Sequence, residues 1–552
     1  MTEAGGAGND RRTIRGYFHA FAPAPEWDDL VLWPPDVFAL ANLVLDHTEG
    51  YRFVVAPPAG RRWPPLSDWN GQVRAAAEAW SDGAGPRGCE PAPLVRRCWS
   101  TVMRHRGAPL ASVRTGEAWD LAAALLTLFA IADEACAKVA SRGRSGPSRS
   151  FERRAWKMLQ THGSLSRLSP TRVRIVPKTR FSMQGITIRS LSRYLALCYE
   201  SVDVRWRSSD PEPSVERDTY NVLLAPWPLA VRADEFRPAL PVHLDNMDTE
   251  HYGFFELAPA PTLECDLLSS LLDSAVQVGG RVDAVMFPES AIDPDAIADL
   301  EHILGEHEAG LLVAGVRQPS TPSMFGRNYL HFGVRTRNGW SRYEQDKHHR
   351  WCLDERQIRQ YRLSRSLQPT RRWWEAIEIR ERILHIIDVG AGVTAAPLVC
   401  EDLARLDEVA DLVRRIGPSL VVALLLDGPQ LGSRWPARYA SVIADDPGSA
   451  VLTLTSYGMA ARCHPPGTRR SRVVAHWNSR TDGVHEIELE PKAAAVLLTA
   501  GIESSTLWTA DGRRHSDVPQ LTLSGVHSLT PPRRARSRRP HAVNAGRNPR
   551  TR

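Results

Sequence analysis

The sequence predicts a layered domain of mixed helices and strands, α/β or α+β, preceded by a mostly helical region. With 552 residues the chain is too long for one ordinary domain. From Thr219 onward, β-rich runs alternate with amphipathic helical patterns, which is typical of layered α/β and α+β domains. Before residue 140 the apolar residues recur with a helical period instead. We therefore expect a helical unit over 1–140 and a layered unit over 218–502.

The helical unit, 1–140, contains two strong helical patterns. The first follows a Pro-Pro pair, with Asp36 as its expected cap, and continues to Leu45. The second covers 119–138 and includes the longest apolar run of the chain, 121–132. That run is well short of the roughly 20 residues needed to cross a bilayer, so we expect a buried helix and no membrane contact.

A basic connecting region and linker, 141–217, joins the two units. It contains two stretches rich in Ser, Gly and Pro, 141–150 and 208–214. Over 138–196 there are 14 Lys and Arg and a single acidic residue, with aromatic residues interleaved. This composition can bind a polyanion such as RNA or DNA, but we favour a basic, solvated face.

The formal net charge of +6 comes from the end of the chain. After Leu529 there are eight arginines and no acidic residue, which leaves the rest at −2. Segment 525–552 has too few apolar residues to offset its ordering entropy, so we expect a disordered basic tail, with weak contact with nucleic acid as the alternative. Residues 1–12 lack the apolar core of a signal peptide, and the eight cysteines form no CxxC pair. We expect a cytoplasmic protein without disulfides or structural metal.

Within 218–502, strands and helices are expected at regular intervals. The expected strands are 220–225, 282–287, 311–316, 329–334, 340–344, 383–389, 394–399, 420–425, 450–455, 473–477 and 484–489. The expected helices are 263–278, 295–307, 402–415 and 434–443. The Asn-Gly pair at 338–339 predicts a tight hairpin turn between two of the strands. We expect regular structure to end near Ile502.

Three polar residues follow apolar strands in this region. Glu289 comes directly after a strand and Pro288, which we expect to end that strand. Lys347 follows a strand of the hairpin, and it is one of only five lysines beside 64 arginines. A retained amine in so arginine-rich a chain indicates a need for a compact ammonium group. Cys400 lies between an apolar strand and an expected helix.

These residue types together fit acyl transfer. A cysteine at a strand-to-helix turn exposes its sulfur, and the helix amides favour a thiolate and can hold an oxyanion. A glutamate supplies the base and a lysine supplies a fixed positive charge. Taken singly, Cys400 reads as a small buried hydrophobe, Glu289 as a capping or solvated carboxylate and Lys347 as a surface residue. Their order on matching strands favours one catalytic site.

In this order the three segments resemble those of the carbon–nitrogen hydrolase, or nitrilase, superfamily, over roughly the C-terminal half of the chain. The matching residues are Pro288 and Glu289, Lys347 with Glu355 eight positions later, and Cys400 followed by Glu401 and Asp402. The Cys-Glu-Asp form is similar to that of the glutaminase domain of NAD synthetases. The resemblance implies an α+β fold, a four-layer α-β-β-α nitrilase-type sandwich, preceded by the mostly helical region.

The resemblance also implies a mechanism. Glu289 takes the proton of Cys400, the thiolate attacks an amide, carbamoyl or nitrile carbon, and Lys347 with the backbone amide of Glu401 stabilises the anion. Water then releases the acid from a thioester, with Glu289 as base and Glu355 assisting. The family needs no cofactor or metal for this reaction, takes a small-molecule amide or nitrile as substrate, and commonly forms homo-oligomers.

Two local features accompany the resemblance. Pro397 lies inside the strand before Cys400 and removes a ladder donor, so an edge position or a bulge is expected there. Segment 361–381 looks like an insertion beside the site, and we expect it to act as a lid or specificity element. The alternative function is a catalytically silent nitrilase-fold scaffold or sensor with a basic nucleic-acid-binding segment, as in bacterial phage defence.

Overall fold

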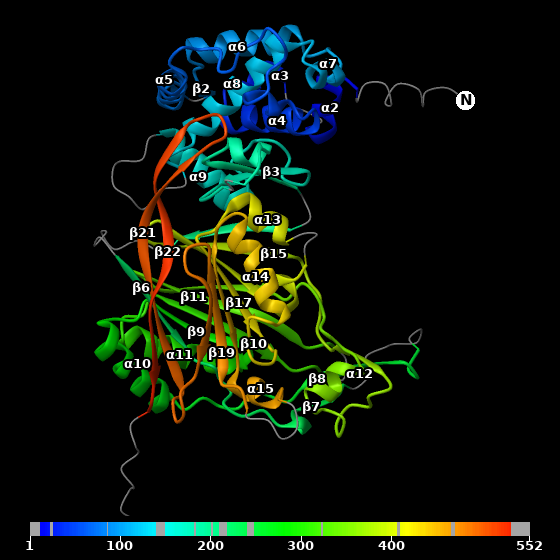
Figure 1. Cartoon of the computed structure of the whole chain (residues 1–552), viewed down its shortest axis with the longest axis vertical. Helices are drawn as coiled ribbons and strands as arrows, with labels where there is room; N and C mark the ends of the chain where they lie inside the picture. Colours follow the sequence, from blue (N-terminus) through cyan, green and yellow to red (C-terminus); the bar gives the residue numbers. More distant parts are fainter. Residues whose placement is uncertain are drawn as a thin grey trace, which may run out of the picture.

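The computed structural model describes residues 12–22, 26–85, 87–139, 150–181, 184–199, 202–208, 218–239, 248–321, 324–405, 409–464 and 470–531. It has mixed helices and strands with several multi-stranded sheets. Helices of the N-terminal part lie at one end of an elongated molecule, and the large sheets lie at the other end (Figure 1). The predicted disordered tail, 525–552, is wrong for 525–529, which are the end of a strand, and from 532 onward it lies outside the described residues.

The N-terminal helices pack around α4 and α8, both nearly all buried. The α-helices are α2 (Ile14–Phe21), α3 (Trp27–Leu30), α4 (Pro34–His47), α5 (Trp69–Asp82), α6 (Pro93–Arg104), α7 (Leu110–Thr115) and α8 (Trp119–Ala135). A short strand pair, β1 (Ala84–Gly85) and β2 (Gly88–Cys89), lies among them. The two predicted helices correspond to α4 and α8. Within the part of the chain that the structure describes, no helix is long and apolar enough to cross a membrane.

Asp36 does not cap α4, which was the expectation. The helix begins two residues earlier, at Pro34, so the Asp36 carboxylate lies inside the first turn and is buried. It accepts hydrogen bonds from the Ser166 hydroxyl and the Arg167 guanidinium, both at 2.7 Å. The carboxylate therefore ties the N-terminal helices to the connecting region.

The connecting region is a folded layer between the helices and the large sheets (Figure 1). It consists of α9 (Ser150–His162), β3 (Val173–Pro177) and β4 (Leu195–Tyr199), and the strand that follows, β5 (Asp203–Ser208), is the edge strand of one of the large sheets. Several of its basic residues are largely buried and contact other segments, so the expected solvated face is wrong for them. These contacts are Arg174 with Asp203, Arg189 with Asp446 and Arg193 with Glu134. Nucleic-acid binding by this region stays a prediction.

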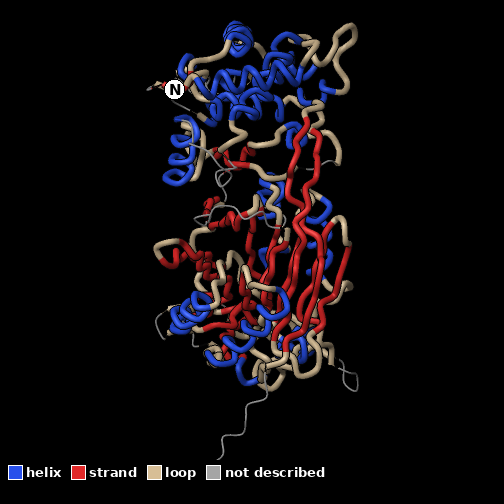
Figure 2. The backbone as a smooth tube through the Cα atoms, turned by 90° about the vertical axis from the view of Figure 1, so that its left-hand side faces the viewer, coloured by secondary structure: helices blue, strands red, loops and turns tan. Residues whose placement is uncertain are grey.

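A long hairpin joins the two ends of the molecule. Its strands, β21 (Ala495–Trp508) and β22 (Arg514–Leu529), extend well past Ile502, where we expected regular structure to end. The hairpin runs along the length of the molecule and reaches the N-terminal helices with its tip (Figure 2). β6 pairs with β21 only from Val496 to Gly501, and beyond that point β21 is paired with β22.

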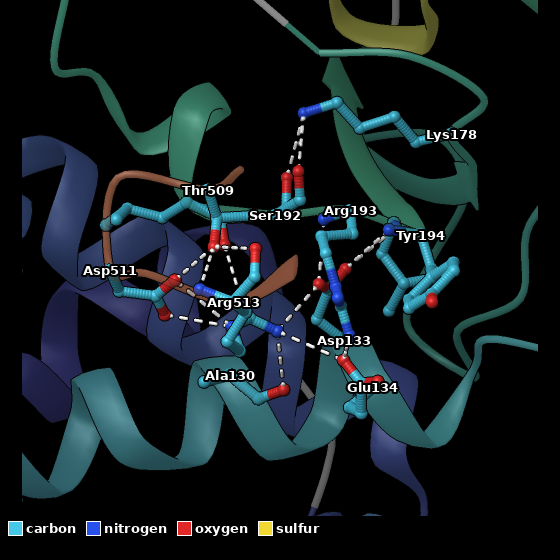
Figure 3. Close-up of polar contacts among 12 residues, drawn as sticks. Ala130, Asp133, Glu134, Lys178, Ser192, Arg193, Tyr194, Thr509, Asp511 and Arg513 are labelled. Carbon is cyan, nitrogen blue, oxygen red and sulfur yellow. Dashed lines mark hydrogen bonds and ion pairs between the residues drawn. The ribbon is translucent and has the colours of Figure 1, made fainter. Parts of the chain in front are cut away.

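Arg513, at the tip of the hairpin, is the centre of a buried ion network (Figure 3). Its guanidinium donates to Asp133 of α8 at 3.2 Å and to Asp511 at 2.9 Å. Asp133 also accepts the backbone amides of Arg193, Tyr194 and Leu195, at 2.8–2.9 Å. Since breaking such a buried network costs several kcal/mol, it fixes the helices, connecting region and hairpin against one another.

Lys178, in the same layer, gives a pH-dependent prediction. Its ammonium is buried and donates only to neutral oxygens, among them the Ser192 carbonyl and hydroxyl, and burial lowers its pKa to about 7. The unfolded chain binds this proton up to a pH of about 10.4, so thermal stability is expected to rise with pH above 7. Lys178→Met should flatten the slope of Tm against pH over this range, and equal slopes for both proteins would contradict the assignment.

The first large sheet has the strand order β12-β11-β10-β9-β6-β21-β22. The strands not yet bounded are β6 (Thr219–Leu224), β9 (Ala284–Ile292), β10 (Leu311–Gln318), β11 (Arg327–Thr336) and β12 (Gly339–Asp346). Its central strands β6, β9 and β10 are parallel, and the other pairs are antiparallel. The turn predicted from the Asn-Gly pair is confirmed, because Thr336 pairs with Gly339 between β11 and β12.

The second large sheet has the order β20-β19-β18-β17-β16-β15-β5. Its remaining strands are β15 (Ile383–Gly390), β16 (Val393–Val399), β17 (Leu420–Leu425), β18 (Ala450–Thr455), β19 (Val473–Ser479) and β20 (Gly483–Glu488). The three central strands, β16 to β18, are parallel. The carboxyl ends of adjacent parallel strands therefore meet along one edge.

The two large sheets face each other, since β9 contacts β17 and β18, and β11 contacts β16. Helices α10 (Cys265–Gly279) and α11 (Ile297–Glu306) bury leucines against the first sheet. Helix α14 (Trp435–Asp445) packs against β18 and β19 of the second. Each fully buried leucine of this kind contributes about 1.5–3 kcal/mol. The expected helix 402–415 is wrong in its first part, which is a short 3-10 helix, Cys400–Leu403, followed after a gap by α13 (Val409–Ile416).

Pro397 lies on a central strand, so the expected edge position is wrong. Strand β15 pairs with β16 only up to Ala395, with an irregularity beside Gly390. Beyond that point the buried Gln345 side chain, from the first sheet, bridges the two strands. It donates to the Pro397 carbonyl at 2.9 Å and accepts the His385 amide at 3.0 Å. The Gln345 side chain therefore mediates the contact between the His385 amide and the Pro397 carbonyl, while the Pro397 nitrogen has no hydrogen to donate to the ladder.

Candidate functional site

Glu289 is carried by a bulge in β9. We expected Pro288 to end the strand, but this prediction is wrong, because β9 continues through Pro288 to Ile292. Pairing with β10 shifts register between Ala314 and Val316, and Ser290 has a φ of 55°, which is uncommon for a residue with a side chain. Such a bulge redirects side chains, and it turns the Glu289 carboxylate into the interior between the two sheets.

The bulge depends on Gly315, directly beside it on β10. A Cβ atom there would lie 2.2 Å from the Pro288 carbonyl oxygen and 2.4 Å from the Glu289 Cα, closer than packed atoms can approach. Gly315→Ala is therefore expected to displace Glu289, with a loss of about 1–3 kcal/mol of stability and a larger loss of activity. The matched control is Gly310→Ala, whose Cβ would lie 3.5 Å from the nearest atom. Thermal unfolding and turnover of both variants test this, and full activity in Gly315→Ala would contradict it.

Lys347 follows β12 and lies between two buried carboxylates. Its ammonium is 2.7 Å from Glu289 Oε1 and 2.7 Å from Glu375 Oε2. The Asn328 side-chain amide donates to both carboxylates, at 2.7 Å each. The amide of Leu426, just beyond β17, donates to Glu289 Oε2 at 2.6 Å. The side chains are held rigidly, because each carboxylate oxygen of Glu289 and the Lys347 ammonium have close partners.

The charges in this cluster shift one another's titration. Burial raises the pKa of Glu289, Glu375 raises it further, and Lys347 and Asn328 act in the opposite direction. Burial alone would lower the pKa of Lys347, but Glu289 and Glu375 outweigh it and raise that pKa well above its ordinary value. Lys347 is therefore a permanent cation, and Glu289 is a carboxylate whose affinity for a proton is increased.

Cys400 lies directly after β16, beside the end of β17, and begins the short 3-10 helix Cys400–Leu403. Its φ of 44° is a left-handed backbone conformation, which is costly for a residue with a side chain and concentrates at functional sites. Glu289 raises the pKa of the Cys400 thiol and Lys347 lowers it, which indicates that both charges lie near the sulfur. The structure thus brings Glu289, Lys347 and Cys400 to one buried region, with the three residues 1–3% exposed.

The thiol is not predisposed to ionise, contrary to our expectation. Burial raises the pKa of Cys400 well above its ordinary value, the Glu289 carboxylate raises it further, and Lys347 only partly opposes this. The helix that Cys400 begins has four residues, so its amides add little. A resting Cys400 is a thiol and needs a base to become a nucleophile.

Glu355 is not at the site, and this part of the prediction is wrong. It lies on α12 (Glu355–Gln360), its side chain is 57% exposed, and it pairs with Arg359 one turn later. Glu375 contacts Lys347 instead. Sequence reasoning missed Glu375 because it lies in segment 361–381, and its only signal was its position after the short apolar run of β14 (Arg372–Glu375).

Glu401 and Asp402 have different surroundings. The Glu401 side chain is partly exposed and near Arg405, while its backbone amide lies in the first turn of the 3-10 helix, where helix amides have no partner within the helix. The buried Asp402 carboxylate accepts the His348 amide at 3.2 Å and His349 Nδ1 at 2.9 Å. It therefore ties the residue pair after Lys347 to the turn after Cys400.

A small four-stranded sheet covers the site. Its strands are β13 (Cys352–Leu353), β14, β8 (Tyr252–Leu257) and β7 (Phe236–Pro238), in the order β13-β14-β8-β7. Together with α12, it forms an apolar cluster that includes Trp351, Tyr361 and Leu426. Segment 361–381 belongs to this cover, and it supplies both Glu375 and Tyr361. In the described part of the chain, no group of three or more His, Cys, Asp or Glu side chains is arranged to hold a metal ion.

Comparison with known proteins gives structural neighbours only. No family model and no curated protein matches the chain. A branch 10 nitrilase superfamily member from Saccharomyces cerevisiae is 11% identical, with 49% of this chain and 86% of that chain covered and a TM-score of 0.31. An amidase from Nesterenkonia sp. AN1, with acetamide added covalently at its active-site cysteine, is 13% identical, with 58% and 94% covered and a TM-score of 0.28. A carbon–nitrogen hydrolase superfamily protein from Xanthomonas campestris is 14% identical, with 57% and 92% covered and a TM-score of 0.26. Many of the matching solved structures are thus members of the nitrilase, or carbon–nitrogen hydrolase, superfamily, and they cover about half of this chain.

Proposed function

We propose that this chain is a thiol-dependent hydrolase of non-peptide carbon–nitrogen bonds in small amides, carbamoyl compounds or nitriles. The observation that carries the proposal is the Lys347 ammonium, held at 2.7 Å by both Glu289 and Glu375 in the buried region that Cys400 enters. A cation, a base and a sulfur on a strained turn are the groups that acyl transfer needs. In the same proposal, the two large sheets and their outer helices form a four-layer α-β-β-α sandwich.

Glu289 is the general base of the proposed reaction. Burial raises the pKa of Glu289, which makes this carboxylate a stronger base toward the thiol proton than an ordinary glutamate. The carboxylate takes the thiol proton, and the sulfur forms a bond to the amide carbon as the carbonyl electrons move to oxygen. The Lys347 ammonium and the backbone amide of Glu401 stabilise that oxyanion.

The second half of the reaction returns the enzyme to its starting state. The oxyanion collapses, the carbon–nitrogen bond breaks, and the leaving nitrogen takes the proton from Glu289. A thioester remains on Cys400. Glu289 then removes a proton from water as the oxygen of that water adds to the thioester carbon. The carbon–sulfur bond breaks, and Glu289 returns its proton to the leaving sulfur, which releases the acid and restores the thiol. Glu375 takes part by holding Lys347, and no further cation is needed in these steps.

Unmet hydrogen-bonding capacity around the cluster supports a ligand site. Buried polar atoms without a hydrogen-bond partner occur in several parts of the described chain, and three of them belong to residues next to this cluster: Ser290 Oγ, Asn328 Oδ1 and Asp427 Oδ2. Ser290 directly follows Glu289, the Asn328 side chain donates to Glu289, and Asp427 follows Leu426, whose backbone amide also donates to Glu289. Because an unpartnered buried polar atom is unfavourable, these three atoms favour binding of a polar molecule beside Glu289.

The test is to trap the acyl-enzyme. Intact-protein mass spectrometry after brief exposure to a panel of amides, nitriles and carbamoyl compounds should show one added acyl group, and peptide mapping should place it on Cys400. Cys400→Ala is the control and should show neither the adduct nor ammonia release. The surface-exposed Cys265 checks for unspecific acylation. Ammonia release equal to that of Cys400→Ala for every compound, with no adduct, would contradict the proposal.

A further inference from the structure

Arg317 lies near the carboxyl end of β10 and projects toward the region of the triad. In the ladder between β10 and β11 it is paired with Asn328, and directly opposed residues of antiparallel strands lie on the same face. The Asn328 side chain contacts Glu289 and Glu375. Along β10, Val313 has the same orientation and packs in the core between the two large sheets. Arg317 therefore belongs to the inner face of the first sheet.

The guanidinium of Arg317 is unpaired. The residue is only 9% exposed, yet no hydrogen bond or ion pair joins its side chain to any residue within the described ranges. Burial lowers its pKa to about 10, and Glu235, Asp293 and Glu375 act in the opposite direction from further away. A buried cation without a partner is strongly unfavourable, and the other buried cations of this region, such as Lys347, have close partners.

The nearby carboxylates are engaged elsewhere. Glu375 accepts Lys347, Asn328 and the Trp351 amide. Glu235 accepts the backbone amide of Arg232, and Asp293 accepts the backbone amide of Asp295. The planar guanidinium fork of Arg317 is thus left with donors that match a carboxylate or phosphate in two parallel hydrogen bonds.

We infer that Arg317 binds an anionic group, a carboxylate or a phosphate, on the part of the substrate that is remote from the carbon–nitrogen bond. This inference rests on the proposed function and specifies its substrate class as small amides that carry an acidic group. An anion there would accept hydrogen bonds from the guanidinium. Asn328, which pairs with Arg317 across the two strands and donates to Glu289, would hold the Glu289 carboxylate in a fixed position relative to the bound anion. The same bond would orient the substrate along the inner face of the first sheet.

The first experiment compares two amides of similar size, one acidic and one neutral. Wild type should hydrolyse succinamate with a higher kcat/KM than butanamide. Arg317→Gln should lower kcat/KM for succinamate about 10- to 100-fold, as expected for a lost charge-assisted hydrogen bond. Its kcat/KM for butanamide should stay within about twofold of the wild-type value. Arg356→Gln, on the exposed face of α12, is the matched control and should change neither. Equal losses for both amides, or no loss, would overturn the inference.

The second experiment measures binding without turnover. By calorimetry, wild type should bind succinate or butyl phosphate, and Arg317→Gln should lose that binding; the ligand that binds distinguishes a carboxylate from a phosphate. Binding of neither, or binding that survives the substitution, would overturn the inference even if Cys400 forms a thioester. Conversely, if the anion binds but no thioester forms on Cys400, the result would contradict the proposed hydrolase function and leave the anion site at Arg317 standing. Because the substitution removes an unpaired buried charge, the variant is expected to keep its thermal stability.

Discussion

Replacing Glu375 by Gln is expected to lower kcat about 100-fold while leaving KM within about threefold, as for a lost positioning contact. Glu375 accepts the Lys347 ammonium at 2.7 Å and Asn328 at 2.7 Å. The amide keeps the size of the side chain but removes a negative charge that holds Lys347. Glu289 then becomes its only carboxylate partner, so the ammonium is drawn toward the base and away from the oxyanion. Steady-state kinetics with the amide identified by acyl trapping provide the measurement.

Glu355→Gln is the matched control for this prediction, because sequence spacing pointed to Glu355 and the structure points to Glu375. Glu355 is exposed on α12, so its substitution should change kcat by less than twofold. Glu375→Asp should restore part of the activity, since it returns the charge. Thermal unfolding separates chemistry from folding, because Glu375→Gln leaves one carboxylate and one ammonium in balance and is expected to keep its Tm. The reverse ranking of the two variants would refute the assignment.

Replacing Lys347 by Met is expected to abolish activity and to cost about 3–5 kcal/mol of stability, the range for one member of a buried ion cluster removed. The substitution leaves Glu289 and Glu375 buried with no cation between them. Burial already raises the pKa of Glu289 and Lys347 opposes this rise, so without Lys347 the cost should be largest at neutral pH and should decrease as the pH falls toward 5. Chemical unfolding at several pH values measures this.

The double variant Lys347→Met with Glu375→Gln tests the electrostatic reason. It removes one of the two uncompensated charges, so it should regain much of the stability while remaining inactive. Lys492→Met, at an exposed position, is the control for lysine substitution in general and should be neutral in both assays. If the double variant were no more stable than Lys347→Met, the loss would come from packing and not from unpaired charge.

Much of the site was visible in the sequence, because its three main residues come after or within apolar strands. Period-two and continuous apolar runs predicted β12 and β16 closely, whereas β9 begins near the predicted position but continues through Glu289 to Ile292. The scarcity of lysine in this chain drew attention to Lys347, and the structure gives that lysine two carboxylate partners. Local patterns succeed here because strand formation and strand ends are decided within a few residues.

The misses have a common physical cause, which is that they depend on contacts between distant segments. Spacing alone selected Glu355, but α12 turns it outward, and the return of β14 beside β8 brings Glu375 to Lys347. Proximity to a helix start suggested a thiolate at Cys400, whereas burial and the Glu289 carboxylate dominate. The reach of β21 and β22 to α8 depends on the pairing of the two strands with each other and on Arg513, which no local pattern indicates.

The sequence by itself determined the strand ends that precede Lys347 and Cys400 and the presence of an apolar strand at Glu289, since apolar patterning and turn residues act locally. Only the tertiary structure decided which second glutamate joins them, in which protonation state the thiol rests, and that Arg317 is a buried cation without a partner. Burial and charge pairing are sums over side chains that are far apart in the chain, so they exist only once the two large sheets and their cover have packed.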